Sequence, residues 1–125
     1  MKKADTPKMT MPEFYQAVGG DIDDVIERLE DLDIVKWNLL GFEDDPSYSE
    51  LLQSLDQHNK KDAFRAAHTL KGICYTFGFQ RLGDSASVIC EKLREGKAPT
   101  KESLYQLSED YHTVIRAIRC LRNSL

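Results

Sequence analysis

Hydrophobic positions recur at spacings of three and four along most of the chain, which is the period of an α-helix. The clearest case is the region 100–123, whose apolar stripe comprises Leu104, Leu107, Tyr111, Val114, Ile118 and Leu121. The same period occurs over 80–95, over 60–77 and, in two pieces, over roughly 33–57. The alternation typical of strands is almost absent. The pattern therefore predicts an all-α fold.

Capping residues and helix breakers mark the ends of these segments. A capping box at Thr10–Glu13 predicts a short helix through Val18, and Asp21 can cap a second short helix. A further capping box at Ser47–Glu50 is expected to open one long segment, and Asn59 the next.

The connections between the long segments are short, which favours antiparallel neighbours. We therefore predict an antiparallel up-down four-helix bundle over 33–123, with short N-terminal helices capping one end. Residues 1–20 are expected to be a peripheral N-terminal segment. A chain of 125 residues suits one domain, so 1–125 should form a single unit.

Composition and charge exclude several classes of function. The net charge of −4 argues against a general nucleic-acid binder. No apolar run approaches the roughly 20 residues of a membrane span, and the polar start lacks the apolar core of a secretion signal, so we expect a cytoplasmic protein that is not bound to membrane. Cys74, Cys90 and Cys120 are widely spaced and read as reduced, buried thiols, and the histidines do not combine with them at metal-ligand spacing. We expect neither a metal nor a cofactor.

The segment 60–77 places a histidine opposite its apolar face. With 100° per residue, the residues within about 40° of the pole opposite His68 are Ala63, Ala66, Leu70, Ile73 and Phe77. The outward face then holds Lys61, Phe64, Arg65, His68, Lys71, Gly72 and Tyr75. This geometry contradicts the ordinary reading of a histidine satisfied inside a core.

The neighbours of His68 suit phosphoryl chemistry. Neutral imidazole is a nucleophile near physiological pH. Lys71, one turn further on, can bring its ammonium group against phosphoryl oxygens. Gly72 costs about 1 kcal/mol relative to alanine inside a helix, and its missing Cβ leaves space for a phosphoryl group and an approaching protein. A surface His–Lys pair beside a tolerated glycine remains the alternative on these residues alone.

The segment His68-Thr69-Leu70-Lys71-Gly72, with Gly78 and Leu82 further on, resembles the signature of the histidine-containing phosphotransfer (HPt) family. The resemblance implies a four-helix bundle that carries a phosphoryl group on His68, with Lys71 and Gly72 beside it, and has no independent catalytic activity. It also implies exchange with aspartates of response-regulator receiver domains, and with a hybrid histidine kinase as a further donor. The metal ion of the reaction, Mg²⁺, would belong to the receiver. The carrier is expected to be a monomer.

A docking face for the receiver follows from the same resemblance. The residues assigned to it are Lys61, Phe64, Arg65, Tyr75, Gly78 and Gln80. Lys60, Lys61, Arg65 and Lys71 make this face locally positive within an acidic chain, which favours an acidic partner.

Two positions depart from the family pattern. Tyr75 stands where relatives usually have a small residue, so it either crowds the receiver or extends the apolar contact. Cys90 stands where many relatives have a Gln or Glu that binds the imidazole, which leaves Glu91 or water as its partner.

The sequence also bears on two other classes of function. The leading alternative is a helical interaction or regulatory bundle in which His68 is not phosphorylated. A metal-dependent or thiol enzyme is disfavoured because no helix brings paired carboxylates and a histidine together inside the bundle, and a kinase because no glycine-rich nucleotide loop occurs.

Overall fold

The computed structural model describes residues 8–124, and its regular secondary structure over this range is entirely helical. The elements are α1 (Met11–Val18), α2 (Ile22–Leu29), α3 (Leu32–Gly41), the 3-10 turn η1 (Phe42–Asp44), α4 (Ser47–Asp56), α5 (Lys60–Phe77), α6 (Gln80–Arg94) and α7 (Lys101–Arg122). The prediction of an all-α fold is confirmed.

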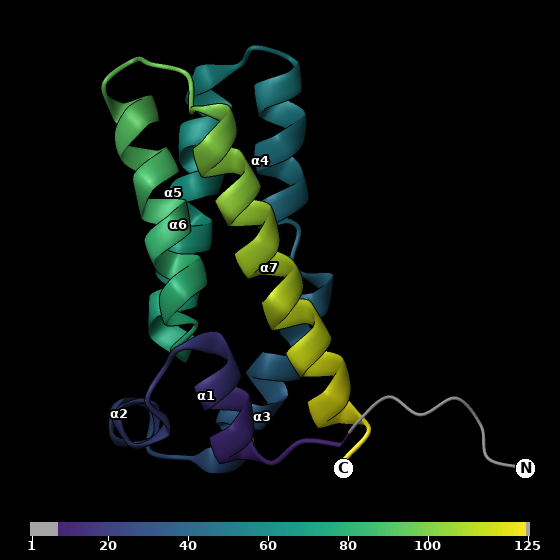
Figure 1. The fold of residues 1–125 in the computed structure, drawn as a ribbon. Helices are drawn as coiled ribbons and strands as arrows, with labels where there is room; N and C mark the ends of the chain where they lie inside the picture. Colours follow the sequence, from purple (N-terminus) through teal and green to yellow (C-terminus); the bar gives the residue numbers. More distant parts are fainter. Residues whose placement is uncertain (1–7, 125) are drawn as a thin grey trace, which may run out of the picture.

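Helices α4 to α7 run alongside one another as an antiparallel bundle, and α1, α2 and α3 gather at one end of it (Figure 1). The first arm of the bundle is in two pieces, as predicted, because the chain is interrupted at Asp45 and Pro46 between η1 and α4. Helices α1 and α2 are referred to below as the N-terminal cap, residues 11–29.

The cap shares its core with the bundle. Phe14 and Phe79 pack with ring centroids 5.9 Å apart, and Phe79 packs on Phe42 at 5.0 Å. Phe14, Tyr15 and Phe79 are fully buried. The N-terminal segment is thus less peripheral than predicted, because α1 contributes large aromatic side chains to the common core. Residues 1–7 lie outside the described part of the chain.

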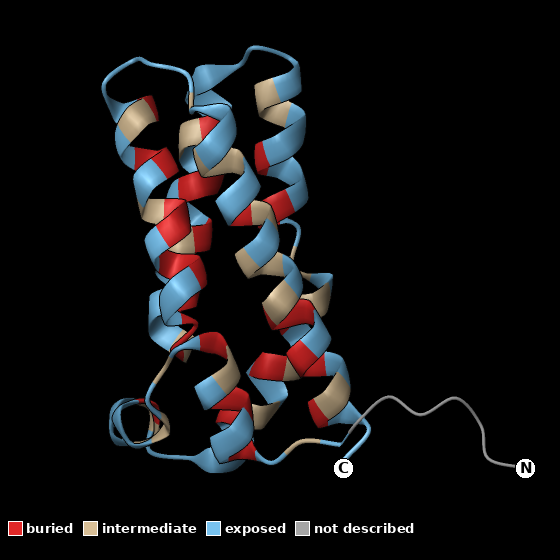
Figure 2. Ribbon diagram, in the orientation of Figure 1, coloured by how far each residue is buried: buried red, intermediate tan, exposed pale blue. Residues whose placement is uncertain are grey.

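The longest helix, α7, follows its predicted stripe. Leu107, Val114, Ile118 and Leu121 are buried, and Leu104 and Tyr111 are partly buried against the same core. Buried positions line the inner faces of the bundle (Figure 2). Between residues 8 and 124, no helix is both long and apolar enough to span a membrane.

Most predicted helix starts are confirmed by their hydrogen bonds. Thr10 and Glu13 form a reciprocal capping box, and Asn59 caps α5 through the Asp62 amide at 3.0 Å. The capping box predicted at Ser47 is wrong. Ser47 is the first residue of α4 and is buried, and its amide donates to Asp45 Oδ1 at 2.9 Å. Asp45 takes this role because Pro46 occupies the cap position and has no polar side chain to offer.

Candidate functional site

Helix α5 presents His68 to solvent, as its apolar pattern predicted. Its buried residues are Ala63, Ala66, Ala67, Leu70 and Cys74. Ile73 and Phe77 were predicted at the centre of the buried face, but both are only partly buried. The buried face is therefore rotated toward Ala67 and Cys74. The rotation moves Phe64 and Lys71 to the flank of the outward face, where both are partly covered.

The His68 ring lies in a short row of flat side chains. It stacks on Phe64 with ring centroids 5.9 Å apart and an interplanar angle of 18°. The guanidinium carbon of Arg94, from α6, lies 5.2 Å from the centroid of the Phe64 ring. A cation is attracted to the face of an aromatic ring. Phe64 therefore contacts both the His68 ring and the positive charge of Arg94 on the neighbouring helix.

Arg94 is a site residue that the sequence reasoning missed. The available signal was its spacing: Arg94 follows Cys90 by one helical turn and so shares its face. What the sequence did not supply is the register between α5 and α6 that places this side chain over Phe64.

Cys90, on α6, lies within electrostatic range of Lys71 and Arg94. Cys90 is fully buried. Burial raises the pKa of its thiol, and the positive charges of Lys71 and Arg94 act in the opposite direction. The thiol therefore stays neutral near pH 7. Glu91, the other suggested partner of the imidazole, accepts a hydrogen bond from Arg94 Nε at 3.2 Å instead.

Gly72 lies one turn from His68 in open space. A Cβ built on Gly72 would meet no atom within 4 Å outside its own helix, and the residue is exposed. The glycine is thus not required by packing. Because glycine has no side chain, the space beside the imidazole is open, as the sequence predicted.

Tyr75 is held against α6 rather than left projecting. Its hydroxyl donates to Asp84 Oδ1 at 2.7 Å, and the amide of Gln80 donates to the same oxygen at 3.1 Å. Its ring occupies the space that a Cβ on Gly83 would need, with Cε1 only 2.6 Å from that position. Partial burial, and secondarily the Asp84 carboxylate, raise the pKa of Tyr75 to about 12, so the phenol remains a donor.

The remaining residues assigned to docking separate into two groups. Lys61 and Arg65 are exposed, and Arg65 pairs with Asp62 at 3.4 Å on its own helix. Gly78 is wrongly assigned. It is buried, and a Cβ there would lie 2.5 Å from Val25 Cγ2, so the N-terminal cap covers it.

A basic groove lies beside the site, toward the N-terminal end of α5. It has a volume of about 410 Å³ and lies between the start of α5 and the end of α6, lined by Lys60, Lys61, Phe64, Leu93 and Arg94. Its floor is apolar and its rim is positive. The groove continues the surface around His68, since Phe64 belongs to both.

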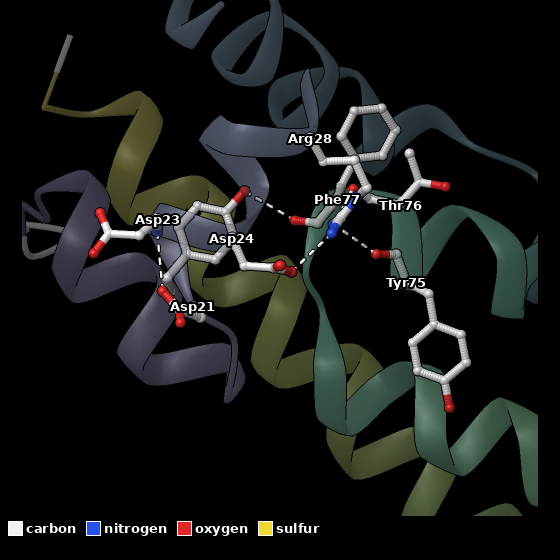
Figure 3. Close-up of polar contacts among 8 residues, drawn as sticks. Asp21, Asp23, Asp24, Arg28, Tyr75, Thr76 and Phe77 are labelled. Carbon is white, nitrogen blue, oxygen red and sulfur yellow. Dashed lines mark hydrogen bonds and ion pairs between the residues drawn. The ribbon is translucent and has the colours of Figure 1, made fainter. Parts of the chain in front are cut away.

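The C-terminal end of α5 is clamped by the N-terminal cap (Figure 3). Arg28 Nη2 donates to the carbonyl oxygens of Tyr75 at 2.9 Å and Thr76 at 2.7 Å, and the Tyr15 hydroxyl donates to that of Phe77 at 2.9 Å. These are the carbonyls that a helix end leaves without intrahelical partners. A cation at this end also interacts favourably with the helix dipole. The clamp fixes the helix that carries His68 without touching His68.

Comparisons with known proteins agree with this geometry. The family model of the Hpt domain matches residues 43–119, which include His68 and its neighbours on α5 and α6 but not the N-terminal cap. Chemotaxis protein CheA of Borreliella burgdorferi is 30% identical over 94 residues, which cover 73% of this chain and 10% of CheA. The chain thus spans about a tenth of the length of this relative. No solved structure matches the chain.

The chain therefore belongs to the Hpt-domain family. Members of this family are phosphocarrier modules of two-component signalling, and the chain contains a phosphotransfer domain of this family.

Proposed function

We propose that His68 is the phosphoryl-accepting residue and that the domain relays the group between receiver domains. The observation that carries the proposal is the exposure of His68 on α5. Beside it, Gly72 leaves open space, and Lys71 and Arg94 place positive charge on the flank of the same surface. His112, on α7, is also exposed, but Nδ1 of its ring lies 2.7 Å from the Ser108 carbonyl of its own helix.

The chemistry needs two in-line displacements. In the first, the His68 nitrogen remote from the backbone attacks the phosphorus of a receiver's aspartyl phosphate. The N–P bond forms as the P–O bond to aspartate breaks, and the carboxylate leaves with the electron pair. In the second, an aspartate of another receiver attacks phosphohistidine and the N–P bond breaks. The divalent metal ion would reside in the receiver, so this chain supplies alignment and charge.

Each neighbour has a distinct part in this scheme. Lys71 and Arg94 offset the negative charge on the transferred group. Gly72 leaves room for the phosphoryl group and for the receiver surface. The basic groove beside Phe64 suits an apolar side chain of the receiver flanked by acidic residues, because such a side chain would cover the partly exposed Phe64 within a positive rim. A hybrid histidine kinase would act as donor through its own receiver domain.

The test measures transfer of the phosphoryl group to this chain from a receiver domain that has first been phosphorylated with an acyl phosphate. Intact mass measurement should show one phosphoryl group per chain, labile in acid and stable in base, as a phosphoramidate is. His68→Gln should abolish the label while circular dichroism stays native. His112→Gln is the matched control and should keep the label. A label that persists in the His68 variant would move the site elsewhere.

The same experiment decides the alternative function. A helical regulatory bundle that binds receivers without being phosphorylated would bind the charged receiver and remain unlabelled. The alternative requires that His68→Gln leave both binding and signalling output unchanged.

A further inference from the structure

Helix α3 is apolar on two sides, and only one of them is covered. Val35 and Leu39 are fully buried in the core. Ile34 and Trp37 point away from it, with 51% and 79% of their surfaces exposed. Trp37 is the only tryptophan of the chain. Large apolar side chains that lie together on a surface often mark an interaction site, so this exposed side is a candidate interface.

A groove continues the exposed side of α3 toward α5. Its volume is about 280 Å³, and it is lined by Trp37, Asn38, Gly41, Phe42, Asp45, Ile73 and Phe77. Gly41 has open space where a Cβ would be, so another backbone can approach closely. The apolar residues Ile34, Trp37, Ile73 and Phe77, together with Gly41, are called the Trp37 surface below.

The charge around the Trp37 surface selects its partner. Residues 21–45 contain ten acidic and two basic side chains, and of the acidic ones Asp24 pairs with Arg28 and Glu43 pairs with Arg119 and Arg122. Among the described residues, Asp45 is the only charged one that lines the groove, and Asp33 and Lys36 line the neighbouring hollow with Ile34 and Trp37. Two acidic side chains thus stand against one basic side chain at this surface. The surroundings of His68 are the reverse, with Lys61, Arg65, Lys71 and Arg94 on the same side. A second copy of this chain would bring the same acidic rim, and an acidic receiver would be repelled as well.

We propose that the Trp37 surface binds a basic amphipathic helix of a partner protein. Its apolar side chains would cover Trp37 and Ile73, and its Lys or Arg side chains would face Asp33 and Asp45. Because α3 has ten residues, a matching helix is about three turns, or roughly 15 Å, long. This is the helix-in-groove mode of recognition, with charge selecting the orientation.

The proposal does not depend on the chemistry of His68. On α5, Ile73 and Phe77 lie on the side of the helix away from His68, at 140° and 180° by an estimate of about 100° per residue. α3 also precedes residue 43, where the Hpt-domain match begins. A partner could therefore hold the domain at this surface while His68 remains free to react.

The experiment uses a synthetic 14-residue peptide of leucine and lysine with an amphipathic pattern. Its controls are a leucine–glutamate twin and a scrambled peptide of the same composition. The emission of Trp37 should shift to the blue with the leucine–lysine peptide alone, since only this peptide offers both the apolar face and the complementary charge. Calorimetry supplies the dissociation constants for variants that lack the tryptophan.

Trp37→Ser should weaken binding of the leucine–lysine peptide at least tenfold, about the loss expected for a central aromatic anchor. Ile34→Ser should also weaken it. Tyr105→Ser is the matched control, because Tyr105 is an aromatic residue of α7 that is 66% exposed, and its loss should change affinity less than about twofold.

Four results would each overturn the proposal. Equal losses for Trp37→Ser and Tyr105→Ser, or equal binding of the scrambled peptide, would show nonspecific attraction. Sedimentation that shows a dimer abolished by Trp37→Ser would make a second copy the occupant. Loss of phosphoryl transfer from the receiver in Trp37→Ser, with circular dichroism unchanged, would make the receiver the occupant. Each of these results leaves the labelling of His68 in the native chain as a separate observation, so the two proposals can fail independently.

Discussion

Two glycines of the family signature, Gly72 inside α5 and Gly78 at its C-terminal cap, have opposite surroundings. Gly72 stands in open space beside His68. Gly78 ends the helix in the left-handed conformation, with φ of 81°, and is covered by Tyr15 and Val25. The first is unnecessary for folding and the second is required by it. The same residue type therefore serves a reacting surface at one point of the helix and its anchorage at another.

The residues that hold α5 in place differ from the residues that surround His68. The C-terminal end of α5 is held by Arg28 and Tyr15 from the N-terminal cap, through hydrogen bonds to the last carbonyls of the helix. The middle of the helix has the exposed His68, with open space beside it at Gly72. Rigidity and accessibility are thus supplied by different parts of the chain, so they can be changed separately.

The largest effect is expected at the anchored glycine. Gly78→Ala places a Cβ 2.5 Å from Val25 and 2.9 Å from Tyr15 at a positive φ. The left-handed conformation costs roughly 1–2 kcal/mol and the overpacking about 1–3 kcal/mol more. Urea unfolding should show a loss of stability of this combined size. A stability within error of the native chain would mean that the cap does not close on Gly78.

The second-largest effect is expected for Lys71→Ala, which should lower the rate of phosphoryl transfer and leave the stability of the fold unchanged. A charge-assisted contact is worth roughly 1.5–3 kcal/mol, so transfer from a charged receiver should slow by about ten- to a hundredfold. Lys61→Ala, further along the same face, is the matched control and should slow transfer much less. Quench-flow measurement of the labelled fraction separates them, and equal effects would assign Lys71 to general steering.

Gly72→Gln sharpens the comparison because it should move stability and rate in opposite directions. Replacing glycine in an exposed helix should stabilise the fold, by up to about 1 kcal/mol. The new side chain fills the space beside His68, so transfer should slow. Urea midpoints and transfer rates measured on one preparation test both parts. Native transfer rates with several receivers would show that the open space has no role.

The smallest effects are expected at Tyr75, whose position resolves an ambiguity in the sequence. Since the ring lies over Gly83 and its hydroxyl binds Asp84, the side chain should serve as an apolar anchor. Tyr75→Ala should weaken receiver binding without accelerating transfer. Tyr75→Phe should cost only about 0.5–1.5 kcal/mol of stability for the lost hydrogen bond. Titration with a receiver domain distinguishes the two variants, and faster transfer in Tyr75→Ala would show crowding instead.

Local patterns were sufficient for much of the fold. The period of the apolar residues located the long helices, and Thr10, Asp21, Asn59 and Thr100 cap helices through short-range hydrogen bonds. The exposure of His68 followed from the same period, because the side of a helix that lacks apolar residues faces water. Ser47 failed as a cap because Asp45, two residues earlier, supplied a competing hydrogen bond.

By itself, then, the sequence determined the helices, the outward histidine and its two neighbours within one turn, since all of these depend on residues a few positions apart. Only the tertiary structure decided which residues meet from different helices. It placed Arg94 over Phe64, laid Tyr75 on Gly83 and buried Gly78 beneath the N-terminal cap. It also left Trp37 uncovered. These outcomes depend on the rotation and axial register of packed helices, which many weak contacts fix together and no short stretch of sequence encodes.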